Sequence, residues 1–189
     1  MRFALMWVGH RLRSGVMMKT VRRILLFAVL ASAIGAWLWL RWREQSYDPP
    51  YSLVEDGLFI GSFVKQPPPG TKAVVNLCGQ ADPHQVEAAL WEPIFEGGSD
   101  PDLEWLRRVI QFIAAQRQAG RPTYVHCLAG VNRSGAVVTA YLMFEHGWGR
   151  DEALRHLQRQ RPVVQPNPTL MRLLSEWEDD LRKADEELP

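Results

Sequence analysis

Two residues constrain this chain most: Cys127 and Arg133, which have five residues between them in the segment HCLAGVNRSG from His126 to Gly135. An apolar stretch at 122–125 precedes the segment, and a largely apolar, helix-compatible stretch at 136–143 follows it. We therefore expect a loop that joins a buried strand to the N-terminus of a helix. Backbone N–H groups at such a helix end have no partner within the helix, so the loop is expected to bind an anion.

The side chains of this loop fit phosphate chemistry. The helix dipole and the N–H donors favour a phosphate dianion, and the same field lowers the pKa of a thiol, so Cys127 is predicted to be a thiolate nucleophile. Arg133 offers a planar pair of donors for phosphate oxygens, and Ser134 can donate a hydrogen bond to the sulfur. His126 is expected to order the loop without reacting. The predicted phosphate-binding residues are Leu128, Ala129, Gly130, Val131, Asn132, Arg133 and Ser134.

Each of these residues has a simpler explanation when it is taken alone. Cys127 could be an inert buried thiol, Arg133 a solvated surface charge and Ser134 a helix cap. These explanations do not require glycine, arginine and serine at fixed offsets from the cysteine. Their joint placement favours catalysis.

The pattern HC-x5-R-[ST] resembles the signature of the cysteine-dependent protein tyrosine phosphatase superfamily, and the chain resembles its dual-specificity branch from about Tyr51 to Leu181. Residues 54–62 look like the entry hairpin of that family, 72–78 like its next core strand, and 160–168 like the turn before its final helix. The resemblance implies an α/β domain of the cysteine-phosphatase type. Short β-branched strands and helical spacing of apolar residues also predict a sheet covered by helices. The expected fold is therefore a central mixed sheet flanked by helices, preceded by one transmembrane helix.

The resemblance also implies a reaction in two displacements. The Cys127 thiolate attacks phosphorus in line while Arg133 and the loop N–H groups hold the oxygens, which gives a phosphocysteine and a leaving alcohol protonated by a general acid. Water then attacks the phosphocysteine, with the same carboxylate acting as base. No cofactor is expected. No metal is expected either, since His84, His146 and His156 show no metal-ligand spacing.

The general acid is where the sequence departs from the family's pattern, which has an aspartate on the loop before the helix that precedes the catalytic strand. Placing 93–96 at the usual strand end puts Glu96 beside the expected position, whereas a gapless alignment puts Gly97 there. Asp100 is the second candidate, although Asp100 and Pro101 also look like the N-cap and first turn of a helix. We predict Glu96 as the acid, with Asp100 or no carboxylate as the alternatives.

Cys78 is the only other cysteine in the chain. An inert core thiol is its simplest interpretation. The segment Asn76-Leu77-Cys78 is also similar to one in phosphatase-and-tensin lipid phosphatases, which implies a thiol that traps the oxidised nucleophile as a disulfide. On this basis Cys78 is predicted as a redox partner of Cys127.

The N-terminal part of the chain has a different character. The stretch from Ile24 to Leu40 is uncharged and apolar, and as a helix it would be about 25 Å long, enough to cross a bilayer. Arginines flank it and tryptophans gather at its far end, which favours a membrane anchor. A signal peptide cleaved near 31–33 and a buried core helix are the alternatives. The predicted organisation is a basic segment at 1–23, a transmembrane anchor at 24–40, a linker at 41–50 and a catalytic domain at 51–185.

Charge differs sharply between the two parts. Residues 1–46 hold eight Lys or Arg and one Asp or Glu, whereas residues 47–189 hold fourteen and twenty. Most basic residues of the first part precede Ile24, so the positive-inside rule favours a single-pass protein with an extracytoplasmic catalytic domain. A thiolate enzyme works most safely in a reducing compartment, which favours the opposite side and leaves the side open.

The expected partners follow from the same features. The leading prediction is a membrane-anchored phosphatase with a monomeric catalytic domain that acts on phosphoproteins, at phosphotyrosine and also phosphoserine or phosphothreonine. A phospholipid or phosphoinositide phosphatase is the alternative, but no lysine or arginine lies at 128–132, where a multiply phosphorylated headgroup would need cations. A tethered phosphate-binding module without turnover is the second alternative. The domain's acidity argues against nucleic-acid binding, and three basic residues are interpreted as a solvated helix face: Arg155, Arg159 and Arg161.

Overall fold

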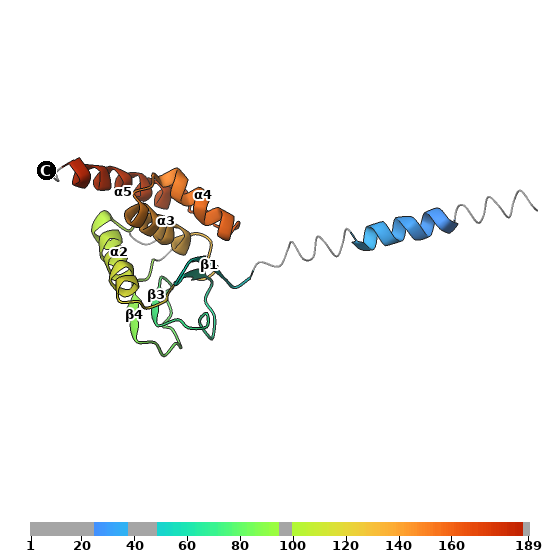
Figure 1. Cartoon of the computed structure of the whole chain (residues 1–189), viewed down its shortest axis with the longest axis horizontal. Helices are drawn as coiled ribbons and strands as arrows, with labels where there is room; N and C mark the ends of the chain where they lie inside the picture. The colour runs from blue at the N-terminus through green and yellow to red at the C-terminus, as the bar shows by residue number, and fades with distance from the viewer. Residues whose placement is uncertain (1–24, 38–48, 95–99, 187–189) are drawn as a thin grey trace, which may run out of the picture. The chain divides into compact units, whose positions relative to one another are not determined.

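The structure, a computed structural model, describes residues 25–37, 49–94 and 100–186. The chain divides into two units, Met1–Asp48 and Pro49–Pro189 (Figure 1). In the first unit, residues 25–37 are helical and expose large apolar side chains, Phe27 among them. Among the described residues, no helix is both long enough and apolar enough to cross a bilayer. The predicted anchor at 24–40 includes Ile24 and residues 38–40, which lie outside the described part of the chain.

The second unit is built on a five-stranded sheet with the order β1-β2-β5-β3-β4. β1 and β2 form an antiparallel hairpin, and the pairs β2–β5, β5–β3 and β3–β4 are parallel. The mixed sheet predicted from the sequence is therefore confirmed. Its strands are β1 (Tyr51–Glu55), β2 (Leu58–Gly61), β3 (Ala73–Asn76), β4 (Ala88–Trp91) and β5 (Thr123–His126).

Four helices complete this unit: α2 (Leu103–Gln118), α3 (Arg133–His146), α4 (Arg150–Gln160) and α5 (Pro168–Glu186). α2 and α3 contact the central strands, α4 contacts β1, and α5 packs on α3. Figure 1 shows the four helices gathered on one side of the strands. Ten consecutive residues of α3, Ser134–Met143, are buried, which explains why its sequence lacks a polar face: a helix that is covered all round is apolar all round.

The two faces of the sheet have different surroundings. Successive strand residues point to opposite faces, and the hydrophobic core beneath the helices contains Val125 and Cys127. Tyr124 and His126 alternate with them, and their rings contact Tyr51, Phe63 and His84. The nucleophile candidate therefore belongs to the helix-covered face, and the histidine before it belongs to the other face.

Two expected element boundaries are wrong. β4 ends at Trp91, so the strand expected to end within 93–96 is shorter. α2 begins after Asp102, whose side chain accepts a hydrogen bond from the backbone N–H of Trp105 at 2.8 Å. Asp100 was the expected N-cap, but a side chain can cap only from the position whose oxygen reaches a free N–H of the first turn, and Asp102 occupies that position.

Candidate active site

The segment after β5 forms a tight loop that ends at the first residue of α3. Cys127 directly follows β5 and is 2% exposed, and Arg133 is the first residue of α3. The Cys127 Sγ lies 3.3 Å from the Ser134 Oγ. The strand, loop and helix expected from the local sequence thus place the thiol, the hydroxyl and the guanidinium at one end of the sheet.

The loop carbonyls are all engaged away from the cysteine. The Leu128 carbonyl accepts from the Phe63 N–H at 3.2 Å, and the Val131 carbonyl accepts from the Gln165 N–H at 3.0 Å. The carbonyls of Ala129 and Gly130 accept from the Arg161 guanidinium at 3.4 and 2.8 Å. Because a peptide group's N–H points opposite to its carbonyl, these contacts turn the loop N–H groups towards the sulfur.

Gly130 is required by this geometry. Its φ of 70° lies in the left-handed region, where residues with a Cβ are strained. A Cβ at this position would lie 2.4 Å from the Gly61 carbonyl carbon and 2.8 Å from the Ser62 nitrogen. Only glycine allows the loop to approach the end of β2 this closely.

The pKa of Cys127 is lowered by the loop. Burial alone would raise it, since burial disfavours the thiolate. The hydrogen bond from the Ser134 hydroxyl and those from the backbone N–H groups of Ser134, Val131 and Gly130 outweigh this effect and hold the pKa of Cys127 below its ordinary value. The arrangement stabilises a thiolate inside an otherwise apolar core.

Two backbone carbonyls from other segments hold Arg133 in place. Its Nη1 donates to the carbonyls of Leu77 at 3.2 Å and Ile94 at 2.9 Å, at the ends of β3 and β4. Its Nε is buried and has no hydrogen-bond partner among the described residues. A buried guanidinium N–H normally has an acceptor, so this donor suits an oxygen of a bound oxyanion.

Arg161 is the functional residue that sequence reasoning missed. The expectation of a solvated helix face is wrong for it, because it is 1% exposed. Its Nη1 donates to the Pro49 carbonyl at 2.8 Å, in addition to its bonds to the loop carbonyls. The only signal for this role was the resemblance of Arg161-Pro162 to a family turn, since helical spacing does not reveal a contact 31 residues away.

Comparisons with known proteins agree with this geometry. Residues 71–180 match the family described as dual specificity phosphatase, catalytic domain. The match covers more than half of the chain. The chain belongs to the dual specificity phosphatase family.

Individual relatives cover this phosphatase domain to different extents. The rat protein phosphatase Slingshot homolog 3 is 46% identical over 68 residues, which are 36% of this chain and 10% of that protein. The Arabidopsis dual specificity protein phosphatase 1 is 27% identical over 143 residues, 71% of this chain and 72% of that protein. The first relatives matched, including fission-yeast tyrosine-protein phosphatase yvh1, are aligned over about a quarter of their length or less.

Solved structures show the same fold. A mouse dual specificity phosphatase complexed with zinc tungstate superposes with a TM-score of 0.64 at 30% identity, and covers 74% of this chain and 93% of its own. PTPMT1 in complex with PI(5)P superposes with a TM-score of 0.63 at 19% identity, over 72% and 99%. The second likeness bears on the fold alone.

The other cysteine of the phosphatase domain lies just past the end of β3. Cys78 is 3% exposed, and its Sγ lies 3.9 Å from the Nδ1 of His126. Burial, and next the charge of Cys127, raise the pKa of Cys78 to about 11. Cys78 is therefore a neutral thiol near neutral pH, and its predicted role as a redox partner stays a prediction.

The general acid of the phosphatase domain stays a prediction as well. Glu96 and Gly97 lie outside the described residues. Asp102 is engaged as the N-cap of α2. Asp100 therefore does not cap α2. It is exposed, and its carboxylate lies 3.8 Å from the Arg172 guanidinium.

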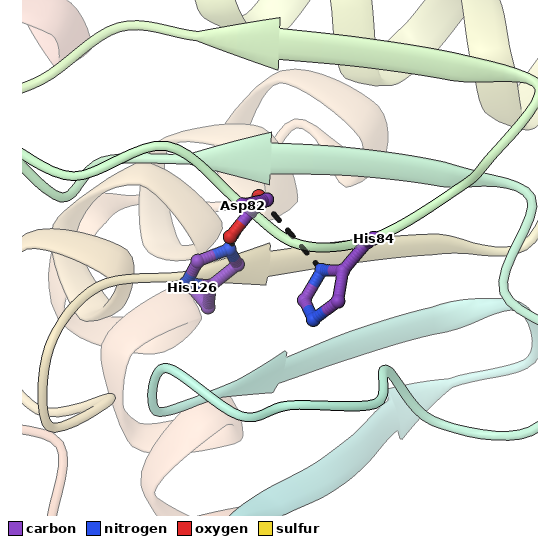
Figure 2. A group of neighbouring side chains, drawn as sticks. All are labelled: Asp82, His84 and His126. Atoms are coloured by element: carbon purple, nitrogen blue, oxygen red, sulfur yellow. Dashed lines mark hydrogen bonds and ion pairs between the residues drawn. The ribbon is translucent and has the colours of Figure 1, made fainter.

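One cluster of potential metal ligands occurs in the described part of the phosphatase domain: Asp82, His84 and His126 (Figure 2). Sequence spacing gave no sign of it, because Asp82 and His126 are 44 residues apart and meet only through the parallel sheet. One member of the cluster, His126, directly precedes Cys127.

Proposed function

We propose that this chain is a phosphatase that hydrolyses phosphomonoesters on proteins through a phosphocysteine formed on Cys127. The observation that carries the proposal is the surroundings of the Cys127 sulfur, where three loop N–H groups and the Ser134 hydroxyl converge. Donors that stabilise a thiolate in a buried loop are also placed to bind the oxygens of a phosphate group that the sulfur attacks. A non-catalytic phosphate-binding module would not need the lowered thiol pKa.

The proposed roles follow from the contacts. The Cys127 thiolate forms the S–P bond while the P–O bond to the leaving group breaks, and Arg133 binds two oxygens with its Nε and its second terminal nitrogen. The carbonyls of Leu77 and Ile94 orient its guanidinium for this. Glu96, or Asp100 in its place, protonates the leaving oxygen and later deprotonates the attacking water. Ser134 stabilises the thiolate when it leaves.

A phosphoprotein is favoured over a phosphoinositide as substrate. Arg133 is the only cation in the loop 127–134, so a second phosphate on a headgroup would find no partner there. Leu128, at the edge of the loop, is 63% exposed and offers an apolar surface to a phenol ring. The Slingshot relatives are named as protein phosphatases and yvh1 as a tyrosine-protein phosphatase. The likeness to PTPMT1 is too distant in sequence to carry a substrate argument.

We also propose that the segment at 24–40 holds the enzyme at a membrane. Its support is the apolar sequence and the exposed Leu25, Phe27 and Val29 of the helix at 25–37. Large apolar side chains exposed along a helix mark a surface that binds an apolar partner, such as a membrane. Flotation of the full chain with lipid vesicles tests this, and full recovery in the unbound fraction contradicts it.

The proposed reaction is tested with the full chain under reducing conditions. Phosphate release is measured from an aryl phosphate, from phosphotyrosine and phosphoserine peptides, and from dispersed phosphatidylinositol phosphate. The Cys127→Ser variant sets the background, and Glu96→Gln and Asp100→Asn identify the acid. Release from the phosphotyrosine peptide that exceeds release from the lipid supports the proposal. Preference for the lipid supports the alternative substrate, and no release above background leaves a binding module.

A further inference from the structure

A second polar cluster lies on the sheet face opposite to the nucleophile. Asp82 and His84 belong to the connection between β3 and β4, and His126 is the last residue of β5. The Asp82 Oδ2 is 3.1 Å from the His126 Nε2 and 3.8 Å from the His84 Nδ1. Figure 2 shows the Asp82 carboxylate against the His126 ring, with a dashed line that joins it to the His84 ring. One ligand atom from each residue lies within 4.8 Å of the others.

Two atoms of the cluster are buried without a hydrogen-bond partner among the described residues: the Asp82 Oδ1, and the His84 Nδ1, which lies 3.8 Å from the Asp82 Oδ2. The His84 side chain is only 1% exposed, so open solvent does not satisfy its nitrogen. A buried polar atom of this kind costs free energy unless something binds it. Hydrogen bonding within the cluster therefore does not account for the arrangement.

The tautomer of neutral His84 is set by its other nitrogen. The Nε2 lies 2.8 Å from the Val64 carbonyl, which can only accept, so the ring proton is on Nε2. The lone pair of Nδ1 is then turned towards the Asp82 carboxylate, a second electron-rich group. A cation between the two satisfies both. A ring N–H that donates to a backbone carbonyl is also the usual support of a metal-binding histidine.

The Asp82 Oδ2 lies near the ligand spacing of a zinc site from each imidazole nitrogen, and the three ligand atoms lie within 4.8 Å of one another. Two ligands about 2.0 Å from a zinc ion at a tetrahedral angle lie about 3.3 Å apart. The two distances from the Asp82 Oδ2 to the imidazole nitrogens, 3.1 and 3.8 Å, bracket this value. The longer one exceeds hydrogen-bonding distance, so no direct hydrogen bond holds His84 to Asp82.

We propose that Asp82, His84 and His126 bind a Zn²⁺ ion through one carboxylate oxygen, Nδ1 and Nε2, with water in the fourth position. Two imidazoles and one carboxylate are a donor set that zinc takes in three-ligand sites. Binding at Nε2 of His126 puts the ring proton on Nδ1, which faces the Cys78 sulfur at 3.9 Å. Cys78 is thus beside a ligand and not itself one.

The ion joins three segments that surround the phosphate loop. His126 is covalently linked to Cys127, His84 is bonded to the Val64 carbonyl, and the neighbouring Phe63 donates to the loop carbonyl of Leu128. The expected role is to hold these segments together, on the face of the sheet that Cys127 does not share. Zinc binding is therefore expected to raise the unfolding temperature. It is expected not to depend on the Cys127 thiolate.

The test uses the full chain carrying Cys127→Ser, so that the active-site sulfur cannot bind metal. Zn²⁺ affinity is measured by calorimetry after chelator treatment, and Co²⁺ is the spectroscopic probe. His84→Gln removes Nδ1 but keeps a donor for the Val64 carbonyl, and His146→Gln is the matched control on an exposed histidine. We expect one Zn²⁺ per chain, at least about tenfold weaker binding in His84→Gln, unchanged binding in His146→Gln, and a tetrahedral cobalt spectrum without a thiolate band.

Three results overturn the proposal: no saturable binding, equal affinity in His84→Gln and its control, or a cobalt–thiolate band that places the ion on Cys78. Folding is checked with a His84→Gln chain that keeps Cys127. Phosphate release by this chain in metal-free buffer shows that the variant folds. If it does not fold, Asp82→Asn replaces it, and the same loss of affinity is expected.

Discussion

Cys78 and Cys127 are both buried at the ends of strands, but the pKa values of their thiols are shifted in opposite directions. Cys127 directly follows β5, and Cys78 lies two residues past the end of β3, the parallel neighbour of β5. Cys78 is 3% exposed and Cys127 is 2% exposed. Burial raises the pKa of each. The pKa of Cys78 rises to about 11, whereas the hydrogen bonds of the loop bring the pKa of Cys127 below its ordinary value.

The difference lies in the backbone around each sulfur. Cys127 begins a loop whose carbonyls are held outwards by Phe63, Arg161 and Gln165, so that N–H groups face the thiolate. The Cys78 sulfur lies 3.9 Å from the Nδ1 of the His126 ring. A buried thiol thus becomes a nucleophile through oriented peptide groups, and burial by itself only suppresses its ionisation.

The largest test of this comparison removes each sulfur in turn. We expect Cys127→Ser to lower kcat by about a thousandfold or more, because a serine hydroxyl is not ionised by the same donors. Cys78→Ser should leave kcat within about threefold, since its thiol takes no part in the displacement. Steady-state release from an aryl phosphate measures both. Equal losses in the two variants would show that the cysteines do not differ in role.

Arg133→Lys tests the partner of the thiolate. A lysine cannot reach the carbonyls of Leu77 and Ile94 and also present two donors to phosphate, so we expect kcat to fall by about 10²- to 10³-fold. Arg155→Lys, on an exposed arginine of α4, is the control and should retain full kcat. A rise in KM with unchanged kcat would mean that Arg133 binds substrate and transition state equally.

Arg161→Met tests what holds the loop carbonyls outwards. The change leaves the carbonyls of Pro49, Ala129 and Gly130 without their buried donor, and we expect a loss of about 2–4 kcal/mol in the free energy of unfolding. Urea denaturation measures it. The exposed Arg159→Met should change stability by less than about 0.5 kcal/mol. Equal stability of the two variants would show that Arg161 does not support the loop.

Ser134→Ala sharpens the electrostatic part of the comparison. The hydroxyl bonds favour the thiolate, so removing it raises the pKa of Cys127 and moves the acidic limb of the alkylation profile to higher pH. The pH dependence of inactivation by iodoacetate reports this shift. An unchanged profile would assign the lowered pKa to the backbone N–H groups alone.

The smallest effect is expected from oxidation. Peroxide converts the Cys127 thiolate to a sulfenic acid, and attack by the Cys78 sulfur then forms the disulfide and releases water. Because the pKa of Cys78 is about 11, the disulfide yield should be low near neutral pH and rise with pH. Mass spectrometry after peroxide measures the yield. Over-oxidised Cys127 alone at every pH would exclude Cys78 as its redox partner.

Local and long-range features differed in how far the sequence could predict them. Cys127, Arg133 and Ser134 lie within one strand–loop–helix segment, so their spacing alone specified which groups would meet. The N-cap of α2 was misplaced by two residues, because Asp100 and Asp102 offer the same side chain and only the path of the backbone decides between them. Glu96 remains a prediction.

The remaining features depend on contacts between distant segments. Arg161 follows an amphipathic helix and has exposed arginines nearby, so its local pattern indicated solvent, but the end of α4 turns it under the phosphate loop. Asp82 and His84 meet His126 because β3 and β5 are parallel neighbours. Neither arrangement has a local periodicity from which it could be predicted.

The bond between Arg161 and Pro49 gives the start of the domain a mechanical role. The same guanidinium holds the carbonyl of Pro49 and those of Ala129 and Gly130, and the Pro50 carbonyl accepts from the N–H of Ser62. Tension applied to the chain ahead of Pro49 is therefore carried by a short path of hydrogen bonds to the peptide groups around the Cys127 sulfur.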